Sequence, residues 1–352
     1  MAPGLFRAAL LGAFLIGSAT PAPAHGWAVE IAPGVFMPYV SLGHPDDNSS
    51  TAADVEMWLR EGGVGLDTAW NYHNQPLVAT GIERSKRARE SIFVTTKIPC
   101  FEREEIALAF VLDDLRQLRT KCEPRGEPPD ARARRARRTD RAGAARSIRA
   151  PPRIERAPRV ERAPRRAARS ARRLPGARPR IARTGRYVDL MLLHSPCASH
   201  EGTAASWRAL QLALGRGLAR AIGVSNFAQA DLAAAIDGSK ALGGVLPAVN
   251  QCSMSIGHRD QPMLELCRRL GITYEAYSPL RHVQLSDARL LAVAKAHGKS
   301  AAQIALRWIL QQGVPLATSP GASHEFTRQD LELDTFELTP AEMDALSAIG
   351  AG

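Results

Sequence analysis

The chain has 352 residues, of which 45% are hydrophobic, so it can bury the core of one large domain or of two smaller ones. Its formal net charge of +11 at first suggests a polyanion-binding protein. Residues 125–186 alone hold 22 arginines against 5 acids, however, so the rest of the chain is acidic. The basic character is therefore confined to one segment, and the rest of the chain is typical of an ordinary acidic soluble enzyme.

The five cysteines do not form a recognisable metal-binding or disulfide pattern. Their number is odd and none are spaced C-x-x-C, which argues against a disulfide framework and against a structural zinc site. We expect most of them to be small buried hydrophobic residues, with a reactive thiol at Cys197 as the weaker alternative. They are Cys100, Cys122, Cys197, Cys252 and Cys267.

Residues 1–24 have the features of a cleavable signal peptide. Arg7 precedes a short apolar run at 8–17, and Ala22-Pro23-Ala24 matches a small-residue cleavage site. The apolar run is shorter than the length that a transmembrane helix needs to cross a bilayer. We therefore expect the secretory pathway or an organelle, with no transmembrane span after cleavage, and a cytoplasmic location if the start codon is misassigned.

Eight short apolar runs alternate with helical patterns after the signal peptide. This alternation predicts an α/β fold with a parallel sheet closed as a (β/α)8 TIM barrel, in two parts at residues 25–123 and 187–352. A G-x-G-x-x-G fingerprint is absent from the sequence, which argues against a Rossmann unit. The expected strands are 37–43, 64–67, 92–96, 187–193, 221–226, 248–252, 272–278 and 315–319, and expected helices include 52–60, 76–87, 102–120, 300–312 and 340–349.

Ionisable side chains follow three consecutive strands. Asp67 and Tyr72 follow the run that begins at Val64, Lys97 follows 92–96, and His194 follows 187–193. In a parallel barrel the chemistry is located where the strands end, at the C-terminal face. We expect these four side chains to meet there, although each alone could be an ordinary cap, surface or core residue.

The motifs around these residues resemble those of the aldo-keto reductase family. The resemblance implies a barrel that reduces a small aldehyde or ketone to an alcohol with NAD(P)H. It also implies that Tyr72 donates the proton, Lys97 lowers the pKa of that phenol, Asp67 holds Lys97, and His194 orients the carbonyl. The matching segments are LDTAWNY at 66–72, FVTTK at 93–97, YVDLMLLH at 187–194, GVSNF at 223–227, VNQ at 249–251 and YEAYSPL at 274–280.

The same resemblance assigns cofactor contacts. It implies that Ser225, Asn226 and Gln251 hydrogen-bond the carboxamide, that Tyr277 stacks on the nicotinamide, and that Ser278 and Leu280 lie nearby.

The last strand departs from the family pattern. Thr318 stands where a lysine is frequent, followed by Ser319, and Arg328 is offset from the position of the arginine that binds the 2′-phosphate. Asp330 stands among the residues that would hold adenine. We expect NADP, with NAD as the alternative, and no metal.

Two further departures concern the substrate pocket. Ser195 replaces a frequent aromatic residue, and the C-terminal tail is short, both of which favour a small carbonyl substrate. His44 replaces the usual threonine or tryptophan after the first strand and would face the cofactor.

Residues 124–186 interrupt the barrel with a segment rich in arginine, alanine and proline. The segment has too little apolar surface to offset the entropy of ordering, so it predicts a disordered loop between a helix and the fourth strand, on the face opposite the active site. Two interpretations stay open: a tether for an anionic partner such as nucleic acid, or an artefact of the gene model. Composition favours the artefact.

We therefore expect a monomeric carbonyl reductase. The alternatives are a cofactor-binding barrel with a sensor or regulatory role, and a protein whose Arg-rich segment binds an anionic partner. The intact set of Asp67, Tyr72, Lys97 and His194 argues against a sensor.

Overall fold

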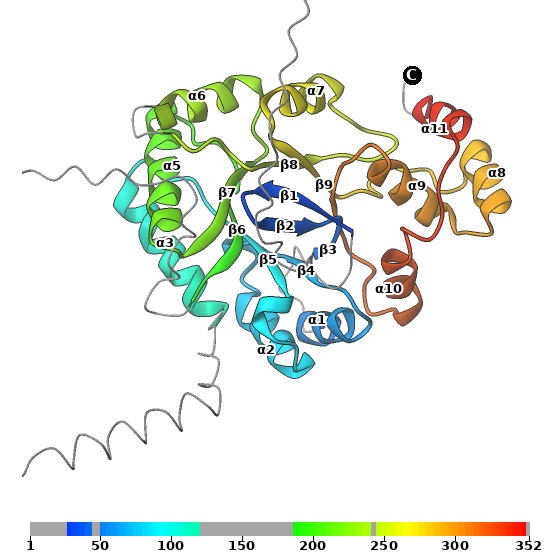
Figure 1. Ribbon diagram of the computed structural model, residues 1–352, viewed down its shortest axis with the longest axis horizontal. Helices are drawn as coiled ribbons and strands as arrows, with labels where there is room; N and C mark the ends of the chain where they lie inside the picture. The colour runs from blue at the N-terminus through cyan, green and yellow to red at the C-terminus, as the bar shows by residue number, and fades with distance from the viewer. Residues whose placement is uncertain (1–26, 44–49, 120–185, 241–243, 350–352) are drawn as a thin grey trace, which may run out of the picture.

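The computed structural model describes residues 27–43, 50–119, 186–240 and 244–349, and confirms the predicted (β/α)8 TIM barrel. Eight parallel strands close in the order β10-β3-β4-β5-β6-β7-β8-β9, with helices around the outside (Figure 1). The barrel strands are β3 (Val40–Gly43), β4 (Gly65–Asp67), β5 (Phe93–Ile98), β6 (Val188–Leu193), β7 (Ala219–Ser225), β8 (Val249–Ser253), β9 (Thr273–Tyr277) and β10 (Leu316–Thr318).

The helices lie close to their predicted positions. Those at 52–60, 76–87, 102–120, 300–312 and 340–349 appear as α1, α2, α3, α9 and α11, with ends shifted by a few residues. The described helices are α1 (Thr51–Arg60), α2 (Gln75–Ser85), α3 (Glu104–Gln117), α5 (His200–Gly215), α6 (Gln229–Lys240), α7 (Gln261–Leu270), α8 (Ala288–His297), α9 (Ala301–Leu310), α10 (His324–Leu331) and α11 (Pro340–Ser347).

The strands β5 and β6, which lead to Lys97 and His194, are buried along their whole length. Every residue of β5 and β6 is buried, because the helices cover one face of these strands and the barrel interior covers the other. The pairing register places Lys97 beside Leu192 and Ile98 beside Leu193. The ends of β5 and β6 therefore reach the same level of the barrel, and the side chains that follow them become neighbours.

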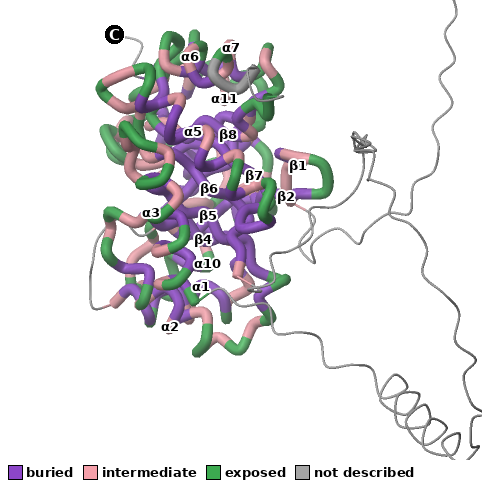
Figure 2. The backbone as a smooth tube through the Cα atoms, turned by 90° about the vertical axis from the view of Figure 1, so that its left-hand side faces the viewer, coloured by how far each residue is buried: buried purple, intermediate pink, exposed green. Residues whose placement is uncertain are grey.

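An N-terminal hairpin, β1 (Ala28–Ala32) and β2 (Val35–Pro38), was not predicted. Its turn contains Gly34 at φ +73°, which a glycine adopts without strain. Apolar hairpin residues pack on the starts of the barrel strands, which places the hairpin over the N-terminal mouth; it projects from one side of the barrel in Figure 2. The packed residues are Ile31, Val35 and Met37 from the hairpin and Phe93, Leu190, Leu192, Ala221 and Val249 from the barrel.

The predicted first strand, 37–43, is wrong as a single element. Met37 and Pro38 end β2, whereas Val40 begins β3. The chain bends at Tyr39. The Tyr39 N–H still donates to the backbone oxygen of Trp27 in the hairpin, whereas its own backbone oxygen accepts a hydrogen bond from Leu316 of β10. The apolar run is continuous in sequence, but its first residues belong to the β1–β2 hairpin and its last residues to the barrel.

Several predictions fall outside the described residues. They concern the signal peptide at 1–24, the contact of His44 with the cofactor, and nearly all of the basic insertion at 124–186. Among the helices of the described ranges, none combines the length and apolarity that crossing a bilayer requires.

Candidate active site

Asp67, Tyr72, Lys97 and His194 meet at the C-terminal mouth of the barrel, as the strand ends predicted. Asp67 is the last residue of β4, Lys97 lies one residue before the end of β5, and His194 follows β6 directly. Tyr72 closes a short 3-10 helix at Trp70–Tyr72 after β4. The Tyr72 and His194 rings lie 5.4 Å apart between centroids in an edge-to-face arrangement. The amine of Lys97 lies 5.2 Å from the centre of the Tyr72 ring.

Lys97 is a buried cation with two fixed acceptors. Its Nζ donates to Asp67 Oδ1 at 2.6 Å and to the backbone oxygen of Thr68 at 3.1 Å. Burial by itself would lower the pKa of Lys97, but its interactions with Asp67 and Tyr72 outweigh that effect and hold the pKa above its usual range. Lys97 is therefore a permanent positive charge beside Tyr72.

The acidity of Tyr72 differs from the sequence-based expectation. Lys97 does lower the pKa of the phenol, but burial raises it by more and Asp67 adds to the rise, so the pKa lies above its usual value. The sequence-based expectation of a lowered Tyr72 pKa took the charge of Lys97 into account but not the desolvation of the phenol. Tyr72 is therefore fully protonated at neutral pH and available as a proton donor.

His194 is neutral at physiological pH. Burial, followed by the charge of Lys97, lowers the pKa of the imidazole to about 4. A neutral imidazole carries one N–H, which it can donate to a carbonyl oxygen without adding a charge. This agrees with the orienting role expected of His194.

Glu275 joins this group and was missed from the sequence. Gln251 Nε2 donates both to Asp67 Oδ2, at 2.8 Å, and to Glu275 Oε2, at 2.9 Å. Glu275 lies in β9 and has no exposed surface. A glutamate inside an otherwise apolar strand was the available signal, since buried acids are rare unless they have partners.

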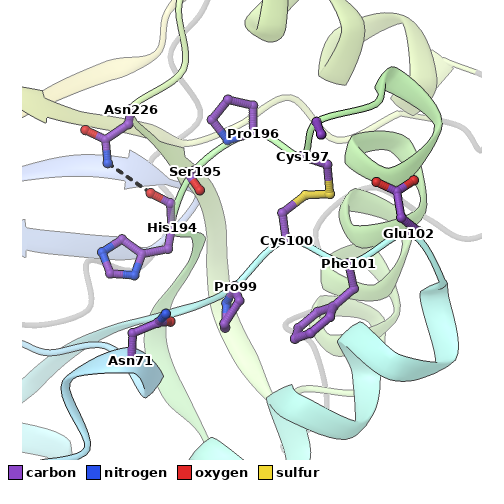
Figure 3. Close-up of a pocket in the computed structure, with 11 residues that line it drawn as sticks. Asn71, Pro99, Cys100, Phe101, Glu102, His194, Ser195, Pro196, Cys197 and Asn226 are labelled. Atoms are coloured by element: carbon purple, nitrogen blue, oxygen red, sulfur yellow. Dashed lines mark hydrogen bonds between the residues drawn. A yellow bond between two sulfur atoms is a disulfide. The ribbon is translucent and has the colours of Figure 1, made fainter.

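A cavity of about 720 Å³ opens beside His194, within the size range of small-molecule sites. Figure 3 shows the His194 ring at one end and a disulfide between Cys100 and Cys197 toward the other. Phe101 is the aromatic side chain on its wall, and Ser195 lines it as expected. The lining residues are Asn71, Pro99, Cys100, Phe101, Glu102, His194, Ser195, Pro196, Cys197, Ala198 and Asn226.

The Cys100–Cys197 disulfide corrects two expectations from the sequence. The two cysteines stand 97 residues apart, yet they follow the adjacent strands β5 and β6, so the barrel brings their Cα atoms to 5.2 Å. Cys197 is therefore not a free thiol. Cys252 and Cys267 remain unpaired, and burial raises the pKa of both, to about 12 and about 11.

Ser225, Asn226 and Tyr277 form one hydrogen-bonded group beside the cavity. Asn226 Nδ2 donates to the backbone oxygen of His194 at 2.9 Å, and Tyr277 Oη donates to Asn226 Oδ1 at 2.8 Å. Ser225 Oγ donates to the backbone oxygen of Gln251. Asn226 has φ +60°, a conformation that asparagine tolerates better than most residues.

The other predicted nicotinamide contacts differ in accessibility. Ser278 and Leu280 are half-buried in the segment after β9, near Tyr277. Gln251 is buried, does not line the cavity, and has its amide nitrogen engaged by the two carboxyl groups.

The residues predicted for the adenosine end lie around β10 and α10. Thr318 Oγ1 donates to Asp330 Oδ2 at 2.9 Å, and burial raises the pKa of Asp330 to about 6. Ser319 is exposed. Arg328 forms an ion pair with Glu61 at 3.2 Å between Nε and Oε2, a partner that the sequence did not suggest.

Comparisons with known proteins agree with this geometry. The sequence model of the Aldo/keto reductase family matches residues 178–351. Morphine 6-dehydrogenase of Pseudomonas putida is 37% identical over 180 residues, which cover 47% of this chain and 59% of that protein. The chain thus spans little more than half of that relative. Glyoxal reductase of Bacillus subtilis is 26% identical over 91% of this chain and 92% of its own length.

Solved structures show the same fold. An aldo/keto reductase from Brucella melitensis superposes with a TM-score of 0.69 at 24% identity, covering 92% of this chain and 98% of that chain. The barrel, the ordered motifs and the sequence matches agree: the chain resembles the aldo/keto reductase family, whose sequence model matches residues 178–351.

Proposed function

We propose that the protein is an NAD(P)H-dependent reductase that converts a small aldehyde or ketone to an alcohol. The observation that carries this proposal is the meeting of a protonated phenol, a buried cation and a neutral imidazole at the edge of one cavity. The resemblance to the aldo/keto reductase family supports it, since similar proteins include a glyoxal reductase and a morphine 6-dehydrogenase.

The residues at the mouth fit a nicotinamide. Asn226 presents an amide to the cavity beside His194, and the half-buried Tyr277 ring is held by its hydrogen bond to that amide. Ser225 and Asn226 would hold the carboxamide, and Tyr277 would pack against the ring. When bound, a reduced nicotinamide would supply a hydride, that is, two electrons and one proton, to the carbonyl carbon.

The chain itself handles the carbonyl oxygen. Tyr72 donates its proton to that oxygen as negative charge develops, and the buried charge of Lys97 stabilises the phenolate that is left. His194 donates its N–H to the same oxygen and fixes its direction. Asp67 keeps Lys97 in place.

The cavity wall favours a compact substrate with polar groups. Phe101 supplies one aromatic face, while Asn71, Glu102 and Ser195 supply polar ones. NADP is the proposed cofactor, with NAD as the alternative, because Arg328 is the cation placed near the end of β10.

The test is oxidation of NADPH and NADH by wild type with a panel of small aldehydes and ketones. Tyr72→Phe should lower kcat by about 10²–10⁴-fold while binding the reduced cofactor normally in a fluorescence titration. His194→Gln should raise KM for the carbonyl more than it lowers kcat. Cofactor binding by wild type with no turnover of any carbonyl would instead identify a sensor.

A further inference from the structure

Glu275 is a buried acid linked to the proposed proton donor through Gln251, Asp67 and Lys97. Its side chain has no exposed surface, and Oε2 accepts a hydrogen bond from Gln251. Oε1 makes no hydrogen bond to any residue within the described part of the chain. A buried acid with one unpartnered oxygen destabilises the fold, so its presence in the middle of a strand points to a role beyond packing.

The amide of Gln251 connects Glu275 to Asp67. Both of its N–H groups are engaged, one by each carboxyl, so the two acceptor oxygens lie within about 6 Å of each other. The other oxygen of Asp67 accepts from Lys97, whose amine lies over the ring of Tyr72. A continuous series of contacts therefore runs from Glu275 to the phenol.

We propose that Glu275 is a positioning residue of the reduction: through Gln251 it fixes the Asp67–Lys97 pair, and its charge state sets the acidity of Tyr72. This inference rests on the proposed function for its catalytic meaning, but the electrostatic coupling can be measured without turnover.

The charges around Glu275 decide its ionisation. Asp67 from β4 is a neighbouring anion, Lys97 from β5 is a neighbouring cation, and Gln251 from β8 is neutral. Burial and then the negative charge of Asp67 raise the pKa of Glu275 to about 8. Near neutral pH the site thus holds one carboxylate against Lys97, and at alkaline pH it holds two.

A second carboxylate would make Tyr72 a weaker acid. Tyr72 titrates above its usual value of 10, where Glu275 is already ionised, so the wild-type phenol experiences both anions. Removing the charge of Glu275 should lower the apparent pKa of Tyr72 by about one unit.

The experiment is an ultraviolet titration of tyrosinate in the free protein. Subtracting the titration of Tyr72→Phe isolates Tyr72 from the other four tyrosines. Glu275→Gln keeps the shape and removes the charge, so the Tyr72 curve should move to lower pH by about one unit. Glu275→Asp should stay near wild type. Glu265→Gln, which removes an exposed glutamate of α7, should leave the curve unchanged.

A curve for Glu275→Gln that coincides with wild type, in a protein whose thermal unfolding is intact, would overturn the proposal. A purely structural role would change the unfolding temperature without moving the phenol. Should Glu275→Gln fail to fold, Glu275→Met supplies the same charge removal with an apolar side chain of similar length.

Activity separates this inference from the proposed function. In an active enzyme the alkaline limb of the reduction profile should move with the Tyr72 titration in Glu275→Gln. A shifted titration in a protein that reduces no carbonyl would reject the reductase and keep the coupling. If wild type reduces a carbonyl but the Tyr72 titration does not shift in Glu275→Gln, the reductase stands and the coupling is rejected.

Discussion

The Nζ of Lys97 lies 2.6 Å from Oδ1 of Asp67, and the two side chains are 1% and 6% exposed. Removing one partner of a buried ion pair leaves the other charge without compensation, whereas removing both is far less costly. This pair therefore contributes to folding and, in the proposed reaction, to catalysis, and mutations can separate the two roles.

Lys97→Met should destabilise the protein by about 3–5 kcal/mol in denaturant unfolding, because Asp67 is left buried without its cation. Lys97→Met/Asp67→Asn should recover more than half of that loss. Activity should stay absent in both variants, since the charge beside Tyr72 is missing. If the double variant loses as much stability as Lys97→Met and Asp67→Asn lose together, the two side chains are not energetically coupled, and the ion pair does not stabilise the fold.

Asp114 should make stability depend on pH. This buried residue of α3 accepts a hydrogen bond from Gln75 Nε2 at 2.7 Å, and burial raises its pKa to about 7. Because the folded pKa exceeds the unfolded one, the acid stabilises the fold below about pH 4. That stabilisation is lost as pH rises to 7, by up to about 4 kcal/mol. Asp114→Asn should therefore gain much more stability over wild type at pH 8.5 than at pH 5, and the gain should disappear toward pH 4.

Asp113 is the matched control on the same helix. Hydrogen bonds from Trp70 and Gln117 hold the pKa of Asp113 below its usual value, so its charge favours the fold above that range. Asp113→Asn should give no gain at pH 8.5. Equal gains in the two variants would point to general charge reduction rather than to burial of Asp114.

The Cys100–Cys197 disulfide should stabilise the fold and the cavity wall together. Cys100→Ser/Cys197→Ser frees two loops that line the cavity, so KM for the carbonyl should rise about three- to tenfold with little change in kcat. Unfolding should become easier by about 2–4 kcal/mol.

Dithiothreitol supplies the control for the disulfide. Treated wild type should match the double variant, and the variant should not respond further to the reagent. Cys252→Ser removes a free thiol of β8 and should leave KM unchanged. A double variant with wild-type KM and stability would show that the bond does not shape the site.

Glu61 should limit the use of NADPH. It follows α1 and pairs with His324, at 2.9 Å, and with Arg328, at 3.2 Å; their hydrogen bonds hold the pKa of Glu61 below its usual range. Glu61→Gln would free Arg328 for a phosphate, so KM for NADPH should fall about threefold or more, with KM for NADH nearly constant. Adding Arg328→Gln should abolish the gain. A parallel change for both cofactors would exclude Arg328 as a phosphate contact.

The sequence alone determined the barrel and the members of its reactive group. The apolar runs that end in Asp67, Lys97 and His194 can be recognised locally in the sequence. Because all strands of a parallel barrel end at the same face, the topology brings these three side chains together. Tertiary structure decided what depends on distances across that face. Cys100 and Cys197 pair because β5 and β6 are neighbours, although 97 residues separate them.

Energies at the site were also decided only in three dimensions. The cation at Lys97 suggested an acidic phenol at Tyr72, but the depth of burial, which no local pattern encodes, outweighs it. Glu275 of β9 is linked to Asp67 of β4 only through Gln251. The side chain of Gln251 extends from β8, the neighbour of β9, across the barrel interior to Asp67. Desolvation and contacts across the barrel arise only when the barrel closes, because both require strands that are distant in sequence to come together.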